Sequence, residues 1–146
     1  MNDPKKRSPH LRGLKIEHIG IAVKDLEKAN KTYETLLGEK PYKSEAVESE
    51  GVTTSFFNCG ESKIELLGAT TDDSPIAKFI AKRGEGIHHI AFAVENIEEE
   101  IDRLKSEGFV LLNEQPKKGA DNKLIAFLHP KSSHGVLVEL CQEIGE

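Results

Sequence analysis

Two histidines and two glutamates recur at matching places in the two halves of this chain. His18 begins the stretch His-Ile-Gly-Ile-Ala-Val, and His89 begins the similar stretch His-Ile-Ala-Phe-Ala-Val. Glu65 follows His18 by 47 residues within Ile-Glu-Leu-Leu, and Glu139 follows His89 by 50 residues within Val-Glu-Leu-Cys. Repetition of this kind indicates that one structural module occurs twice. Each copy opens on a strand with one histidine and closes on a strand with one glutamate.

These four side chains have the chemistry of a metal centre. Two imidazoles and two carboxylates form a mixed nitrogen and oxygen donor set, which suits a divalent ion such as Co, Zn, Mn or Ni. Taken singly, a histidine on an apolar strand is more often a hydrogen-bonded core residue than a ligand. The glutamate of Ile-Glu-Leu-Leu could equally face solvent. Because both residue types recur together, we predict a metal site formed by His18, Glu65, His89 and Glu139.

The hydrophobic pattern predicts the same order of elements in both halves. Asp25 and Asn96 are typical helix N-caps, and Gly38 and Gly108 are typical residues after a helix end. A short third helix is expected at residues 76–82, after Asp73-Ser74-Pro75. The expected strands are residues 15–23, 43–48, 52–58, 62–67, 87–94, 109–113, 123–129 and 135–142.

Strand alternation predicts where the four residues point. Ile19, Ile21 and Val23 share one strand face, while His18 shares the other with small residues. The bulky face is expected under the helices, which leaves the histidines and glutamates on a concave, helix-free face. His88 falls on the helix-covered side and is expected to be structural.

We therefore predict an α+β fold in which two βαβββ modules form one curved, eight-stranded, half-open barrel. Residues 1–13 are expected to be a flexible tail, and residues 14–146 a single domain. The modules would span residues 14–70 and 86–142, joined by a helical linker at residues 71–85. Each module alone is small, so the two are expected to share one core.

Composition narrows the classes of function. The net charge is −5 and 31% of residues are charged, so no nucleic-acid-binding surface is expected. No apolar run reaches transmembrane length, and no secretion signal follows the start. Cys59 and Cys141 show no paired pattern, which is typical of a reducing compartment. We expect a cytoplasmic protein that binds no membrane.

The motifs resemble those of the vicinal oxygen chelate (glyoxalase-like) superfamily and, within it, the methylmalonyl-CoA epimerase family. The resemblance runs from His18 almost to the C-terminus. It includes the four stretches already described, together with Asp73-Ser-Pro-Ile, Gly84-Glu-Gly-Ile-His-His and Phe127-Leu-His-Pro-Lys. The histidine and glutamate strands are shared by the whole superfamily, whereas the last three motifs are more particular to the epimerases.

The resemblance implies the half-open barrel, a divalent metal at His18, Glu65, His89 and Glu139, and a homodimer. It also implies epimerisation of an acyl-CoA substrate, (R)- and (S)-methylmalonyl-CoA, through an enolate that the metal stabilises. Inversion requires two acid/base groups, and Glu139 is the candidate for the first. A carboxylate is expected on the strand after Gly51, but residues 52–58 contain none. Glu48 and Glu50 are weak candidates for the second group. The candidate cations for the CoA phosphates are Lys117, Lys118, Lys123 and Lys131.

Other activities fit part of the same pattern. A glyoxalase I-type isomerase acting on a glutathione hemithioacetal would use a similar site, as would a thiol transferase of the antibiotic-resistance type. A bleomycin-resistance-like binding protein would need no metal, so retention of all four ligand-type residues speaks against it. An extradiol dioxygenase is disfavoured because its chain is normally longer and it uses two histidines and one glutamate.

Overall fold

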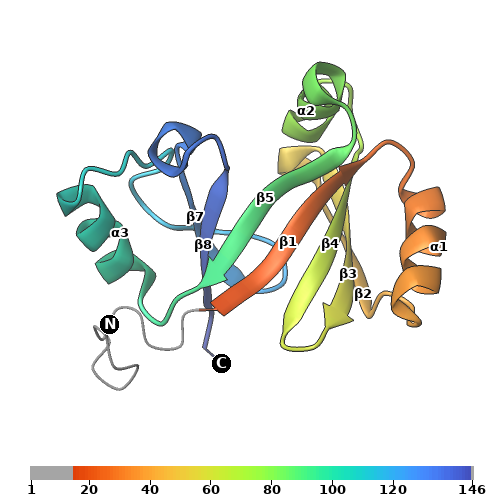
Figure 1. The fold of residues 1–146 in the computed structure, drawn as a ribbon, viewed down its shortest axis with the longest axis horizontal. Helices are drawn as coiled ribbons and strands as arrows, with labels where there is room; N and C mark the ends of the chain where they lie inside the picture. The colour runs from red at the N-terminus through yellow and green to blue at the C-terminus, as the bar shows by residue number, and fades with distance from the viewer. Residues whose placement is uncertain (1–14, 146) are drawn as a thin grey trace. The chain divides into compact units, whose positions relative to one another are not determined.

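The computed structural model describes residues 15–145, so the predicted tail at residues 1–13 lies outside the described part (Figure 1). None of the helices in residues 15–145 combines the length and apolar character needed to span a bilayer. The elements are β1 (Lys15–Val23), α1 (Leu26–Leu37), β2 (Lys43–Val47), the 3-10 helix η3 (Glu48–Glu50), β3 (Val52–Cys59), β4 (Ser62–Ala69), α2 (Pro75–Arg83), β5 (Gly86–Ala93), α3 (Ile97–Ser106), β6 (Lys117–Lys118), β7 (Lys123–Leu128), the 3-10 helix η4 (Pro130–Ser133) and β8 (Val138–Glu143).

The predicted fold class is confirmed. Eight strands follow the order β2-β3-β4-β1-β5-β8-β7-β6 and are accompanied by α1, α2 and α3. β1 pairs with β4 in parallel, and β5 pairs with β8 in parallel, whereas the β2–β3, β3–β4, β6–β7 and β7–β8 pairs are antiparallel. Both halves of the chain therefore use the same connections, as the sequence repeat predicts.

The chain divides into two compact units, which we describe separately. His18–His89 form the N-terminal unit, while residues 15–17 and those from Ile90 onward form the C-terminal unit. In the N-terminal unit, the Asp25 carboxylate accepts a hydrogen bond from the Lys28 backbone N–H at 3.1 Å, and Gly38 ends α1 with φ of 74°. Both features confirm the predicted helix limits, because an N-cap carboxylate and a left-handed glycine satisfy groups that the helix leaves unpaired.

Helices lie against both faces of the sheet in the N-terminal unit. Ile21 and Val23 of β1 pack with side chains of α1, as predicted for the bulky face. Ala22 points the other way and packs with Ile76 of α2. The prediction that the histidine face is free of helices is therefore wrong at the Ala22 end. The Asp-Ser-Pro segment starts α2, which packs over Ala22. The Ser74 hydroxyl caps this helix by accepting a hydrogen bond from the Ala77 N–H at 3.1 Å.

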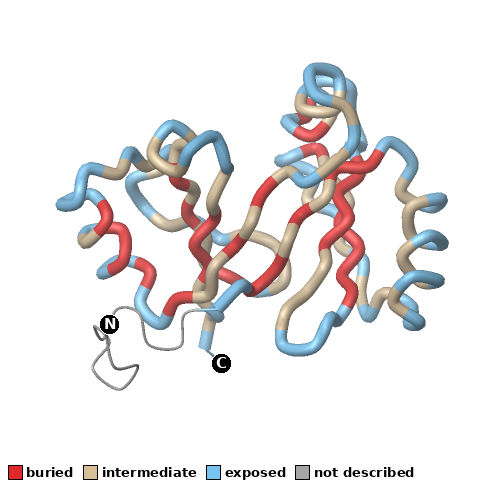
Figure 2. The backbone as a smooth tube through the Cα atoms, viewed as in Figure 1, coloured by how far each residue is buried: buried red, intermediate tan, exposed pale blue. Residues whose placement is uncertain are grey.

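The C-terminal unit contains α3, which has buried residues, unlike α1 of the N-terminal unit. The Asn96 side chain caps it by accepting from the Glu99 N–H at 3.1 Å, as predicted. Its buried residues Ile97, Ile101 and Leu104 pack against β7 and β8, and Figure 2 shows this buried stripe, whereas α1 has no buried residue.

The prediction of a strand at residues 109–113 is wrong. The structure has only an isolated bridge between Leu111 and Leu128 there, and the short β6 pairs with β7 further along the chain. The Asn113 side chain explains the interruption. It accepts a hydrogen bond from the Phe127 N–H at 2.8 Å and donates to the Gln115 carbonyl at 2.9 Å, so a side chain takes the place of ladder pairing.

Candidate metal centre

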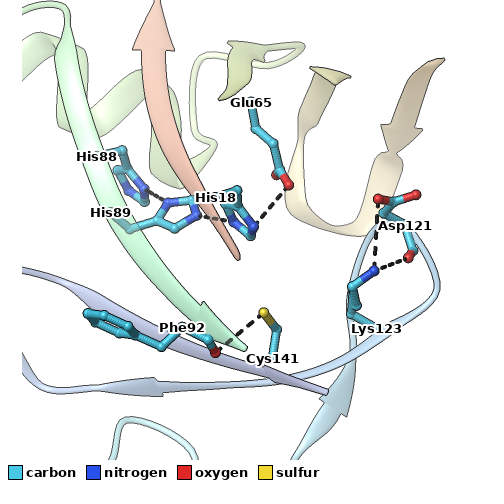
Figure 3. Close-up of polar contacts among 8 residues, drawn as sticks. All are labelled: His18, Glu65, His88, His89, Phe92, Asp121, Lys123 and Cys141. Atoms are coloured by element: carbon cyan, nitrogen blue, oxygen red, sulfur yellow. Dashed lines mark hydrogen bonds and ion pairs between the residues drawn. The ribbon is translucent and has the colours of Figure 1, made fainter. Parts of the chain in front are cut away.

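His18 and His89 meet inside the N-terminal unit. His18 is 4% exposed and His89 is 5% exposed. Their Nε2 atoms lie 2.9 Å apart, and their rings are almost perpendicular, at 88° (Figure 3). The two histidines that the sequence repeat singles out therefore converge through the same ring atom.

Gly20 gives the His89 ring its space. A Cβ at Gly20 would collide with three atoms of that ring, so no larger residue fits here without moving His89. Gly20 lies two residues after His18 on the same face of β1 and pairs with Glu65 in the neighbouring strand. The small residue beside the histidine is therefore part of the site, as predicted from strand alternation.

Glu65 and His88 hold the outer nitrogens of the two rings. The Glu65 carboxylate, 6% exposed, lies 3.0 Å from His18 Nδ1, and His88 Nδ1 lies 3.0 Å from His89 Nδ1 (Figure 3). The His88 ring also stacks edge-on against Phe79 of α2, with ring centroids 4.9 Å apart. His88 therefore contacts α2, which packs over Ala22, and it also contacts His89; strand alternation, which put His88 on the opposite face, indicated neither contact.

This geometry fits a divalent ion. A metal-binding imidazole uses the lone pair of one nitrogen while its other nitrogen donates its N–H to a neighbour. Two imidazole nitrogens about 2.1 Å from one ion would be about 3.0 Å apart at the right angles of an octahedral centre and about 3.4 Å apart at a tetrahedral one. The Nε2 separation of 2.9 Å, which is also a hydrogen-bond distance, is closer to the octahedral value. The Nδ1 contacts supply the outer partners that such ligands require.

Glu139 belongs to the C-terminal unit. It lies on β8, pairs with Ala91 of β5 and Phe127 of β7, and is 5% exposed. A buried carboxylate is costly unless it is paired or binds a cation. The structure thus brings three of the four predicted ligands, His18, Glu65 and His89, together within one unit, and it buries the fourth in the other.

Of the remaining candidates, only Lys123 is withdrawn from solvent. Glu48 and Glu50 are exposed in η3. Lys117, Lys118 and Lys131 are exposed, whereas Lys123 is 9% exposed, with its Nζ 3.3 Å from the Asp121 carbonyl and 4.0 Å from the Asp121 carboxylate (Figure 3).

Two other predicted features lie where the sequence suggested. His129 caps η4 by accepting from the Lys131 N–H at 3.0 Å, and His134 follows η4 in a left-handed conformation, as expected of loop residues. Cys59 is a free, exposed thiol, and the buried Cys141 thiol contacts the Phe92 carbonyl at 3.5 Å (Figure 3).

Comparison with known proteins agrees with this geometry. The sequence pattern of the Glyoxalase/Bleomycin resistance protein/Dioxygenase superfamily matches residues 17–127. The chain belongs to this superfamily. Among its members, the human mitochondrial methylmalonyl-CoA epimerase is 43% identical over 88% of this chain and 73% of its own length. The ethylmalonyl-CoA/methylmalonyl-CoA epimerase of Cereibacter sphaeroides is 44% identical over 88% of this chain and 97% of its own.

A solved member of the superfamily has the same fold. A single-residue variant of the Streptomyces coelicolor methylmalonyl-CoA epimerase, in complex with 2-nitronate-propionyl-CoA, superposes with a TM-score of 0.84. It is 35% identical, and the match covers 90% of this chain and 95% of its own. The resemblance stated from the sequence motifs is thus confirmed at the level of both sequence and fold.

Proposed function

We propose that this protein is a methylmalonyl-CoA epimerase that interconverts the (R) and (S) forms of its substrate with the help of a divalent metal ion. Its identity of 43–44% with two epimerases over 88% of the chain supports the reaction. One observation of the structure carries the site: the Nε2 atoms of His18 and His89 face each other at 2.9 Å in a buried position.

The substrate carbon that inverts lies between a thioester and a carboxylate. Its C–H bond is broken when a base on one face takes the proton, and the electron pair moves toward the thioester oxygen. An acid on the opposite face then returns a proton to the carbon, which completes the inversion without any redox change. The reaction therefore requires two acid/base groups and stabilisation of the negative charge on oxygen.

A metal ion would be held by His18 and His89, and we include Glu139 as a further ligand. Support for Glu139 comes from strand register, because β5 continues from His89 to Ala91 on one face and Ala91 pairs with Glu139. When bound, the ion would act as a Lewis acid on the substrate oxygens. Glu139 is also our candidate for one acid/base group.

Glu65 belongs to the same proposed centre. The sequence predicts it as a ligand, and its contact with His18 Nδ1 gives it a second role, since a carboxylate there fixes the ring and raises the basicity of the coordinating nitrogen. Metal affinity should therefore depend on Glu65 whether it binds the ion directly or holds the His18 ring, although the loss on substitution would differ between the two roles.

The partner that we propose is an acyl-CoA, and the proposed assembly is a homodimer, as the resemblance to the epimerases implies. Light scattering on the purified protein would test the dimer. A cytoplasmic location is proposed because the two cysteines of the sequence show no paired pattern, which is typical of reducing compartments, and cell fractionation would test it.

The reaction is tested with metal-stripped protein that is reloaded with cobalt. One epimer of methylmalonyl-CoA is incubated in deuterated water, and loss of the α-proton signal is followed by NMR. We expect exchange and formation of the other epimer only with metal present. Metal binding without exchange would contradict the epimerase and direct attention to glutathione hemithioacetals. Absence of both would favour a binding protein.

A further inference from the structure

Few carboxylates of the N-terminal unit are withdrawn from solvent. Of all its aspartates and glutamates, only Glu34, Glu45 and Glu65 are not exposed. Glu34 lies on α1, which covers the face of the sheet opposite to His18. Glu45 lies on β2, so it is the one carboxylate besides Glu65 that a strand of this unit holds away from full exposure.

Strand register places Glu45 on the same sheet face as Glu65. Glu45 pairs with Thr54, which pairs in turn with Leu67. Residues paired directly across strands point to the same side, and Leu67 and Glu65 are two residues apart on β4, so they also share a face. Two strand spacings and one repeat of the pleat put the Glu45 and Glu65 Cα atoms about 12 Å apart.

Lys43 fixes the Glu45 carboxylate. Its Nζ lies 3.0 Å from Glu45 Oε1 and 5.4 Å from the centre of the Phe56 ring, and Phe56 is fully buried and pairs with Glu65. The Lys43 and Glu45 side chains are 38% and 32% exposed. Glu45 is therefore held in place on the site's face, but it can still exchange a proton with water between turnovers.

We propose that Glu45 is the second acid/base group of the epimerisation, in addition to Glu139; this inference rests on the proposed function. In one direction Glu139 accepts the proton from carbon, and the protonated Glu45 carboxyl donates its own proton to the other face. In the reverse direction the two exchange roles. Each returns to its starting state by proton exchange with water.

The two acidic residues that the sequence offered for this role are less well placed. Glu48 and Glu50 lie in η3, beyond the end of β2, and both are exposed. No strand pairing directs either side chain to the face that holds His18 and Glu65. They serve instead as controls, since Glu48→Gln removes the same charge three residues away.

The test compares wild type, Glu45→Gln and Glu48→Gln, each loaded with cobalt and given each epimer separately in deuterated water. Wild type and Glu48→Gln should invert and exchange both epimers. Glu45→Gln should invert at least about 100-fold more slowly, the usual contribution of a general acid/base. It should still exchange the α-proton of the one epimer that Glu139 deprotonates. Cobalt affinity and melting temperature should match wild type.

Two results would overturn the inference while leaving the proposed function intact. One is inversion by Glu45→Gln at the wild-type rate. The other is loss of exchange with both epimers although cobalt still binds, because this would assign Glu45 to substrate binding. Failure of the wild type to exchange either epimer overturns the proposed function itself. If Glu45→Gln does not fold, Glu45→Asp is used, and its inversion should slow more than its exchange; equal slowing overturns the inference.

Discussion

At the scale of single residues, the site depends on nitrogens that face inward and partners that hold the rings from outside. His18 and His89 each have a second residue at Nδ1, Glu65 for one and His88 for the other. This arrangement commits Nε2 of both rings to the same small space. Such outer contacts usually change metal affinity by about 10- to 100-fold when removed.

We predict that Glu65→Gln lowers cobalt affinity about tenfold and Glu65→Leu about 100-fold, as measured by isothermal titration. The amide can still accept a hydrogen bond from His18 Nδ1, whereas leucine cannot. Glu61→Gln, on the exposed turn before β4, is the matched control and should bind cobalt normally. A loss far beyond 100-fold with both Glu65 variants would mean that direct ligation outweighs the contact with His18, and unchanged affinity would exclude both roles.

Gly20→Ala should weaken cobalt binding by at least tenfold and leave the protein folded. The new methyl group would displace the His89 ring, while the backbone at Gly20 needs no left-handed conformation. Gly145→Ala is the control, because a methyl group there meets no neighbour. Cobalt titration and circular dichroism separate the two effects, and unchanged affinity in Gly20→Ala would mean that His89 is not a ligand.

At the scale of elements, local signals predicted well and long-range pairing did not. Asp25, Gly38 and Asn96 mark helix limits through contacts within a few residues, so the sequence alone revealed them. The irregular segment at residues 109–113 depends on Asn113 capping Phe127, a contact across 14 residues that no periodicity encodes. The packing of α2 over Ala22 was missed for the same reason. The contact between His88 and His89 joins neighbouring residues, and it was missed because strand alternation points neighbours to opposite faces.

Loss of the Asp25 cap should destabilise the protein without changing its chemistry. Asp25→Ala removes the hydrogen bond to the Lys28 N–H, and such a change costs about 1 kcal/mol of unfolding free energy. Urea denaturation measures it, and the epimerisation rate should stay at the wild-type value because α1 lies on the face opposite to His18. Asp72→Ala, in the exposed turn before α2, should leave stability unchanged. A rate that falls with Asp25→Ala would mean that α1 takes part in substrate binding.

At the scale of the whole molecule, the repeat predicted the connections that strand pairing confirms. Parallel pairing of β1 with β4 and of β5 with β8 follows from two copies of one module. The same logic allots one histidine and one glutamate to each copy, so a metal bound by all four would link the copies. Any free energy of binding would then stabilise both halves together.

Metal binding should therefore raise the melting temperature of the whole chain as one transition. Cobalt at 100 times its dissociation constant should add about 2.7 kcal/mol of stability, because the ion binds the folded protein alone. Calorimetry should show that His18→Ala and Glu139→Gln each lose most of this gain in stability. The first variant removes a proposed ligand from the N-terminal unit, and the second removes one from the C-terminal unit. His134→Ala, in a loop, is the control and should keep the full gain. If Glu139→Gln kept it too, the ion would be held by the N-terminal unit alone, and Glu139 would remain free to act on the substrate purely as a base.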